Sequence, residues 1–298
     1  PEKSDFPVTV LDSMRSRVRS FYMEDKLVQG SMLRSDIRQG FGISFLFAVA
    51  GIVICLCFDS WETLKATINN PLIYGEYATI CVLYFYFNAI SFGGVFSHYM
   101  LSILAALPFA ANYSIEQQNC AVVYRILRSS KRNYCSTKIL VSAICGGLTV
   151  CIGCLLFILA LSTYLPLISS QKVLELSAVP YACTLSIGGG VPYFVISLYL
   201  AFLRGALYSS VGMCVSAFLP NPYIAVCSPM IFELFLVECG RLLRLPAALR
   251  LDLILSARGT LFSDSATLVI VTGVVLSIII LCFKLFSARC ERRLTYGA

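Results

Sequence analysis

Six blocks of apolar residues divide the chain, and most of them are long enough to cross a lipid bilayer. A transmembrane helix needs about 20 predominantly apolar residues, because the hydrocarbon core of a bilayer is about 30 Å thick. Only 13% of the 298 residues are charged, roughly half of the 25% that is usual in water-soluble domains. The blocks predict an all-α polytopic membrane protein with six transmembrane helices, at residues 41–58, 78–109, 134–162, 191–219, 222–238 and 266–286.

The basic residues predict which ends of these spans face the cytoplasm. With both termini inside, the cytoplasmic segments hold 16 of the 23 Lys and Arg residues and the opposite side holds six. Cytoplasmic loops of membrane proteins carry such an excess, so we assign the net charge of +7 to topology and expect no nucleic-acid partner. We expect a cytoplasmic N-terminal segment with an interfacial helix at 1–39, a transmembrane domain at 40–288 and a cytoplasmic tail at 289–298.

The segment between the second and third blocks has helical character of its own. Ser114 and Gln117 have the spacing of a capping box, which predicts a helix that begins at Ser114. Three side chains here are more apolar than a simple loop requires, namely Ile115, Val122 and Tyr124. We expect a helix over 114–129 that either lies on the membrane or docks a partner.

One arginine lies inside a predicted span, where an unpaired charge is costly and marks a functional or paired residue. Arg204 precedes Leu219 by 15 residues, which places it about 22 Å from the turn at about 1.5 Å per residue. On the next helix, Glu233 and Glu238 lie about 16 and 24 Å from Pro222. These depths predict an ion pair between Arg204 and one of the two glutamates that braces the fourth and fifth spans; contact with a substrate is the alternative.

Three local patterns follow one another in the chain. The first comprises Leu107-Pro108-Phe109, Ile115-Glu116-Gln117, Tyr124-Arg125 and a basic cluster before Tyr134 and Lys138. The second runs from Gly212 to Asn221, with Ala225 and Pro229 following, and the third is a long external segment before the last span. In this order the patterns resemble the membrane subunit of a type-2 ABC exporter, the permease of an ATP-binding-cassette transporter, from about residue 31 to residue 293.

The resemblance implies a function and a set of functional residues. Two such permeases would pair in a bacterial plasma membrane and export an amphipathic or hydrophobic cargo, such as a peptide, drug or lipid, by alternating access. Coupling to the partner ATPase would involve Ser114, Ile115, Glu116, Gln117, Val122, Tyr124 and Arg125. Spans two and five would line the pathway with Tyr84, Phe87, Asn88, Phe232 and Phe235.

The chain carries no nucleotide-binding motif of its own. It lacks the sequence G-x-x-x-x-G-K-[ST], and the three glycines at 188–190 are followed by Val191-Pro192 without a lysine. ATP and magnesium are therefore expected on a separate ATPase chain, and this chain is expected to be non-catalytic and without a cofactor. A single histidine also makes a multi-histidine metal site impossible. An intramembrane lipid-modifying enzyme and an ion-coupled carrier or channel remain as alternatives.

Overall fold

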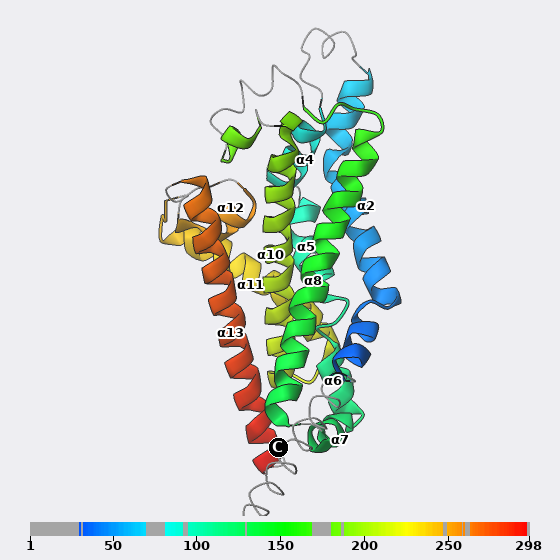
Figure 1. The fold of residues 1–298 in the computed structure, drawn as a ribbon, viewed down its shortest axis with the longest axis vertical. Coiled ribbons are helices and arrows are strands. Elements are labelled where there is room, and N and C mark those ends of the chain that lie inside the picture. Colours follow the sequence, from blue (N-terminus) through cyan, green and yellow to red (C-terminus); the bar gives the residue numbers. More distant parts are fainter. Residues whose placement is uncertain are drawn as a thin grey trace, which may run out of the picture.

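The structure, a computed structural model, is helical in all its regular secondary structure over the residues it describes (Figure 1). These residues are 30, 32–69, 81–91, 95–128, 130–168, 180–185, 188–246, 249–257, 259 and 263–296. Five segments there are long and apolar enough to cross a membrane, namely Met32–Trp61, Lys131–Ser162, Val191–Phe218, Pro222–Leu242 and Asp264–Arg293. The expected all-α class is confirmed, and these helices fit an integral membrane protein.

Four predicted spans correspond to single long helices, α8 (Lys131–Ser162), α10 (Val191–Phe218), α11 (Pro222–Leu242) and α13 (Asp264–Tyr296). In the described part of the expected tail at 289–298, α13 continues to Tyr296. Residues 287–296 contain neither glycine nor proline, so nothing in this stretch ends the helix.

The first predicted span is part of a longer helical segment. Residues 32–40 form a helix, a turn follows at 41–42, and α2 runs over Ile43–Asn69. Of the interfacial helix expected in 1–39, residues 1–29 and 31 lie outside the described residues, while residue 30 and 32–39 are helical.

The structure describes residues 81–91 and 95–109 of the second predicted span, 78–109. The span is represented by α4 (Val82–Ser91) and α5 (Val95–Ala106), with a turn at 107–111. Residues 78–80 and 92–94 lie outside the described residues.

α8 and α10 lie side by side along the centre of the bundle (Figure 1). Their backbones approach each other closely at Gly146 of α8 and Gly205 of α10. A methyl group on Gly146 would lie 2.7 Å from the carbonyl oxygen of Gly205 and 2.9 Å from that of Ala105 on α5. Because backbone oxygens cannot move aside like a flexible side chain, only glycine permits this three-helix contact.

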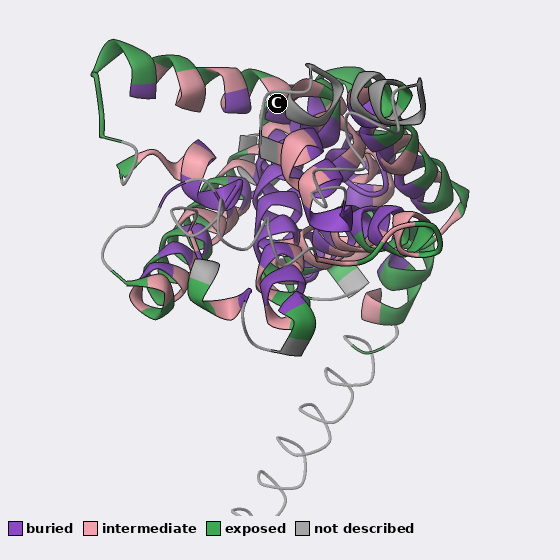
Figure 2. Cartoon of the chain, turned by 90° about the horizontal axis from the view of Figure 1, so that it is seen from above, coloured by how far each residue is buried: buried purple, intermediate pink, exposed green. Residues whose placement is uncertain are grey.

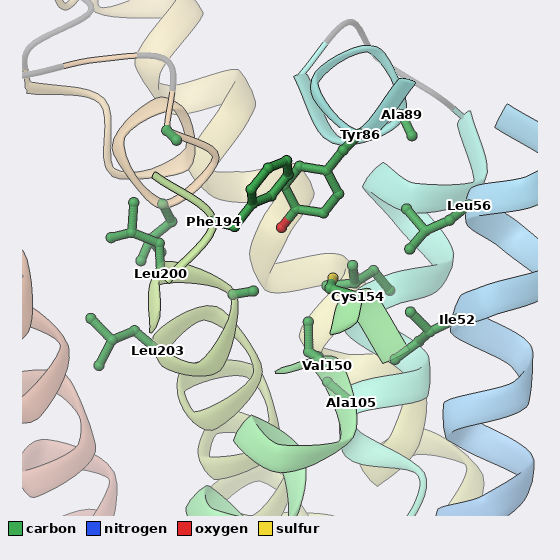
Figure 3. Close-up of a cluster of buried hydrophobic side chains, with 14 of the residues drawn as sticks. Ile52, Leu56, Tyr86, Ala89, Ala105, Val150, Cys154, Phe194, Leu200 and Leu203 are labelled. Atoms are coloured by element: carbon green, nitrogen blue, oxygen red, sulfur yellow. The ribbon is translucent and has the colours of Figure 1, made fainter. Parts of the chain in front are cut away.

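The buried residues gather in the centre of the bundle, and exposed residues surround them (Figure 2). In the core close-up, Tyr86 of α4 points toward Phe194 of α10, with ring centroids 6.0 Å apart (Figure 3). The Ser197 hydroxyl donates a 3.0 Å hydrogen bond to the Tyr86 oxygen. On the rim, large apolar residues such as Phe47 and Val269 are 70% and 73% exposed. Such outward apolar surface is suited to lipid contact.

Candidate functional site

Two short helices, α6 (Asn112–Gln118) and α7 (Ala121–Arg128), lie at the end of the bundle where α8 begins and α13 ends (Figure 1). The single helix expected over 114–129 is therefore wrong, because the chain turns at Cys120, whose φ is +55°. The capping box is wrong as well. The N-cap of α6 is Ala111, which makes no side-chain cap hydrogen bond, and Ser114 is buried within the helix.

A buried network of charged residues holds these helices to the spans. The Lys138 ammonium lies 2.9 Å from Asp36 Oδ1 and 2.6 Å from Glu116 Oε1. Arg125 Nη1 contacts the same two oxygens, at 3.1 and 2.6 Å. The Tyr134 hydroxyl donates a 2.8 Å hydrogen bond to Glu116 Oε2. Two cations thus bridge two carboxylates, and the four formal charges cancel.

The network connects four separate helical segments. Asp36 comes from the helix at 32–40, Glu116 from α6, Arg125 from α7 and Lys138 from α8. The side chains of Lys138, Asp36 and Glu116 are 0%, 1% and 6% exposed, so water screens these pairs little. Removing one partner of a buried pair typically costs about 3–5 kcal/mol, because a buried charge is left uncompensated. The four segments are therefore expected to move together.

Apolar contacts tie α6 to the end of α13. The rings of Tyr113 and Phe286 meet edge-on with centroids 4.9 Å apart. The Cys290 thiol donates to the Tyr113 oxygen at 3.4 Å. Burial, together with the neighbouring Cys290, raises the pKa of the Tyr113 phenol above its ordinary value, so the group stays neutral at physiological pH. Val122 of α7 is buried in the same cluster.

The opposite face of α7 is apolar and exposed. Val123, Tyr124 and Leu127 are 48%, 75% and 80% exposed, and Ile115 of α6 is 45% exposed. Exposed apolar surface of this kind marks a site of contact with another protein or with a membrane. α7 therefore has one face fixed to the bundle and one face open to a partner.

The seven residues expected to couple to a partner thus divide into two groups. Ile115 and Tyr124 are exposed and accessible to a second molecule. The others have inward contacts or partial burial: Ser114, Glu116 and Val122 are buried, and Gln117 and Arg125 are half-buried. Ser114, Glu116 and Val122 are covered by this chain, so any part they have in coupling would act through their contacts inside the bundle. Sequence reasoning also missed Asp36. Lys138 lies four residues inside an apolar block, and a charged residue at such a position predicts an acidic partner nearby.

The intramembrane arginine has a partner on the adjacent helix. Arg204 and Glu233 form an ion pair between α10 and α11, with side chains 5% and 1% exposed. The Arg204 Nε also donates to the Tyr208 oxygen at 3.4 Å. Of the two candidate glutamates, Glu238 instead lies 3.3 Å from Arg241 on the surface, and its side chain is 61% exposed. The pair joins two helices that are also linked by a turn of three residues, 219–221.

The expected pathway residues do not all face the same environment. Tyr84 of α4 and Phe232 of α11 are half-buried and pack against the same core cluster. Phe87 and Asn88 are also half-buried, whereas Phe235 of α11 is 62% exposed.

No family model, curated protein or solved structure matches this chain. Among the described residues, no group of three or more His, Cys, Asp or Glu side chains could hold a metal ion. The helices alone therefore define this chain as an integral membrane protein. Its distinctive features are the buried network around Lys138, the Arg204–Glu233 pair and the exposed apolar face of α7.

Proposed function

We propose that this chain is the membrane-spanning permease subunit of an ATP-driven exporter. It pairs with a second permease chain and with separate ATPase subunits, and it moves an amphipathic or hydrophobic cargo by alternating access. The six-span topology belongs to this proposal, with α4 and α5 together serving as the second span. So does the orientation with both termini in the cytoplasm of a bacterial cell.

The observation that carries the proposal is the two-sided character of α7. α7 lies at the end of the bundle where α8 begins (Figure 1). Its outer face presents the exposed side chains of Val123, Tyr124 and Leu127. Its inner face is tied through Arg125 to Asp36, on the helix that leads into α2. A force applied to the outer face would reach the spans through short ionic contacts rather than through a flexible loop. This is what a subunit needs when its energy comes from a separate ATPase.

The Arg204–Glu233 pair supports the same mechanism. Because the pair braces α10 against α11, the two helices would move as one unit when α6 and α7 shift. Gln118 of α6 donates a 3.1 Å hydrogen bond to the Pro220 carbonyl in the turn that joins them. Displacement of α6 would therefore act directly on this hairpin.

A second copy would complete the pathway. The outward side of α11 carries Phe235 and Ile231, which are 62% and 66% exposed. In a dimer that buries this side of α11, Phe235 and Ile231 would face the second chain. Together with Phe232 they would line an apolar route for the cargo. That surface would favour a cargo with apolar groups.

Affinity purification of the full chain from its native membrane tests the proposal. The expected result is that an ATPase subunit co-purifies, and that Tyr124→Asp reduces its recovery at least tenfold. Tyr164→Asp is the matched control, because Tyr164 is 89% exposed at the opposite end of α8 and should leave recovery unchanged. Absence of any ATPase with the wild-type chain, or equal recovery with both variants, would overturn the proposal.

A further inference from the structure

The last turns of α13 place two arginines against the end of α10. The Arg289 guanidinium carbon lies 5.9 Å from the centroid of the Phe218 ring. Arg293, one helical turn further on, donates a 3.3 Å hydrogen bond from Nη2 to the Phe218 carbonyl oxygen. Both arginines are half-buried, so part of each side chain stays open to the surroundings.

These two positive charges have no acidic partner among the described residues. The nearby carboxylate of Glu291 lies 2.7 Å from Lys131 of α8, which it neutralises. Arg289 Nε, and Arg293 Nε and Nη1, are buried and have no hydrogen-bond acceptor in the described part of the chain. Guanidinium N–H groups withdrawn from water without an acceptor are unfavourable. An external anion would approach the accessible part of these half-buried side chains and compensate their charge.

The end of α10 compensates only part of this charge. Its C-terminal carbonyls carry the equivalent of roughly half a negative charge, and Arg293 uses one of them. More than one positive charge therefore remains between Arg289 and Arg293. The exposed Arg292 adds to the positive potential.

The depth of Arg289 matches the phosphate layer of a bilayer, and Arg293 lies one turn further out, with its side chain directed back toward the membrane as side chains of an α-helix point toward its N-terminus. The apolar block ends at Phe286, which is buried. Arg289 and Arg293 follow it by three and seven residues, or about 4.5 and 10.5 Å along the helix. The polar headgroup layer of a bilayer, which contains the phosphates, adds roughly 5–7 Å to each side of the hydrocarbon core. An anion that reaches the two guanidinium groups from this layer would be a lipid phosphate.

We propose that Arg289 and Arg293 form a binding site for the phosphate of an anionic phospholipid, between the ends of α13 and α10. A guanidinium group can donate two parallel hydrogen bonds to phosphate oxygens, which favours arginine over lysine at such a site. The acyl chains would lie along the exposed apolar face of α13, where Leu281 and Leu285 are 54% and 45% exposed. The site depends on the placement of α13 across a bilayer and not on the transport activity.

Two measurements test the site, native mass spectrometry for lipid occupancy and thermal unfolding for stability. Each uses the full chain with phosphatidylglycerol, with phosphatidylcholine and with inorganic phosphate. The expected result is a saturable phosphatidylglycerol adduct and a higher melting temperature than with either other additive. In Arg289→Gln/Arg293→Gln the occupancy should fall at least fivefold. Arg292→Gln removes one positive charge, half of what the double variant removes, from an exposed position of the same helix and should change the occupancy less than twofold.

Three outcomes would overturn the proposal in different ways. Equal occupancy in the double variant and in Arg292→Gln would show that general charge, not this site, attracts the lipid. Equal stabilisation by inorganic phosphate would show that the site takes a free anion and not a lipid. Should the double variant fail to fold, Arg289→Lys/Arg293→Lys keeps both charges and is expected to lower the occupancy two- to threefold; unchanged occupancy there would also contradict paired guanidinium contacts.

Discussion

Lys138 and Asp36 lie 102 positions apart in the sequence and form a buried 2.9 Å ion pair. Asp36 belongs to the helix that leads into α2, and Lys138 to the second turn of α8. Through Glu116 and Arg125 the same pair holds α6 and α7. The end of the bundle that presents the apolar face of α7 is thus built around a compensated set of charges.

Loss of Lys138 should be more damaging than loss of a surface lysine. Lys138→Met leaves Asp36 and Glu116 buried with Arg125 as their remaining cation, and we expect the free energy of unfolding to fall by about 3–5 kcal/mol. Lys131→Met removes only a partly exposed pair with Glu291, and should cost less than about 1 kcal/mol. Denaturant unfolding of both purified variants in detergent measures the difference. Equal losses would contradict the role given to the buried network.

Replacing both Arg204 and Glu233 should lower the free energy of unfolding less than replacing Arg204 alone. Arg204→Met leaves Glu233 as an uncompensated buried charge and should cost about 3–5 kcal/mol. Arg204→Met/Glu233→Met replaces the pair with apolar side chains and should recover most of this loss. A double-mutant cycle in the same unfolding assay gives the coupling energy, with Glu238→Gln as the exposed control. Additive losses from the two single variants would show that the pair is not coupled.

Alanine should have opposite effects at two glycines. A Cβ on Gly205 would lie 2.8 Å from Val150 Cγ2 and still closer to the Gly146 carbonyl oxygen, whereas one on Gly273 would have no neighbour within 4 Å. Gly205→Ala should destabilise the chain by about 1–3 kcal/mol through overpacking. Gly273→Ala should stabilise it by about 0.5–1 kcal/mol through helix propensity. Thermal unfolding of the two variants measures both effects, and a tolerated Gly205→Ala would contradict the close approach of α8 and α10.

Thiol labelling can test the expected orientation. Cys120 lies in the turn between α6 and α7 and Cys183 between α8 and α10, and both are exposed. With cytoplasmic termini, a membrane-impermeant maleimide added to intact cells should modify Cys183 and leave Cys120 unmodified, as read by peptide mass mapping. In opened membranes both should react. Labelling of Cys120 alone in intact cells would invert the topology.

The labelling of Cys183 should depend on pH and on Asp264. The Cys183 thiol donates a 3.0 Å hydrogen bond to Asp264 Oδ2, and this bond to the carboxylate raises the pKa of the thiol above its ordinary value. Because the thiolate is the reactive form, labelling should accelerate as the pH rises toward this elevated pKa. Asp264→Asn should lower the pKa and speed labelling at neutral pH. An unchanged rate in the variant would exclude the hydrogen bond as the cause.

The apolar blocks were sufficient to predict the helical class and most of the long helices. Helix ends were predicted where strong signals exist: α11 begins at Pro222 as expected, with the Asn221 side chain accepting from the Tyr223 N–H. The capping box at Ser114 failed because tertiary packing buries that serine within α6. The exposed and buried faces of α7 could not be separated from the sequence alone, since both contain apolar side chains.

For this protein, the sequence alone determined that the chain belongs in a membrane, because hydropathy is a local sum over about 20 residues. It also limited the partner of Arg204 to two glutamates, because helix rise converts position into depth. Only the tertiary structure decided between them: Glu233 faces α10, whereas Glu238 lies on the surface beside Arg241. The rotation of each helix about its axis depends on packing between segments that are distant in the sequence. The contact between Asp36 and Lys138 depends on the same packing, so a local sequence pattern cannot predict either.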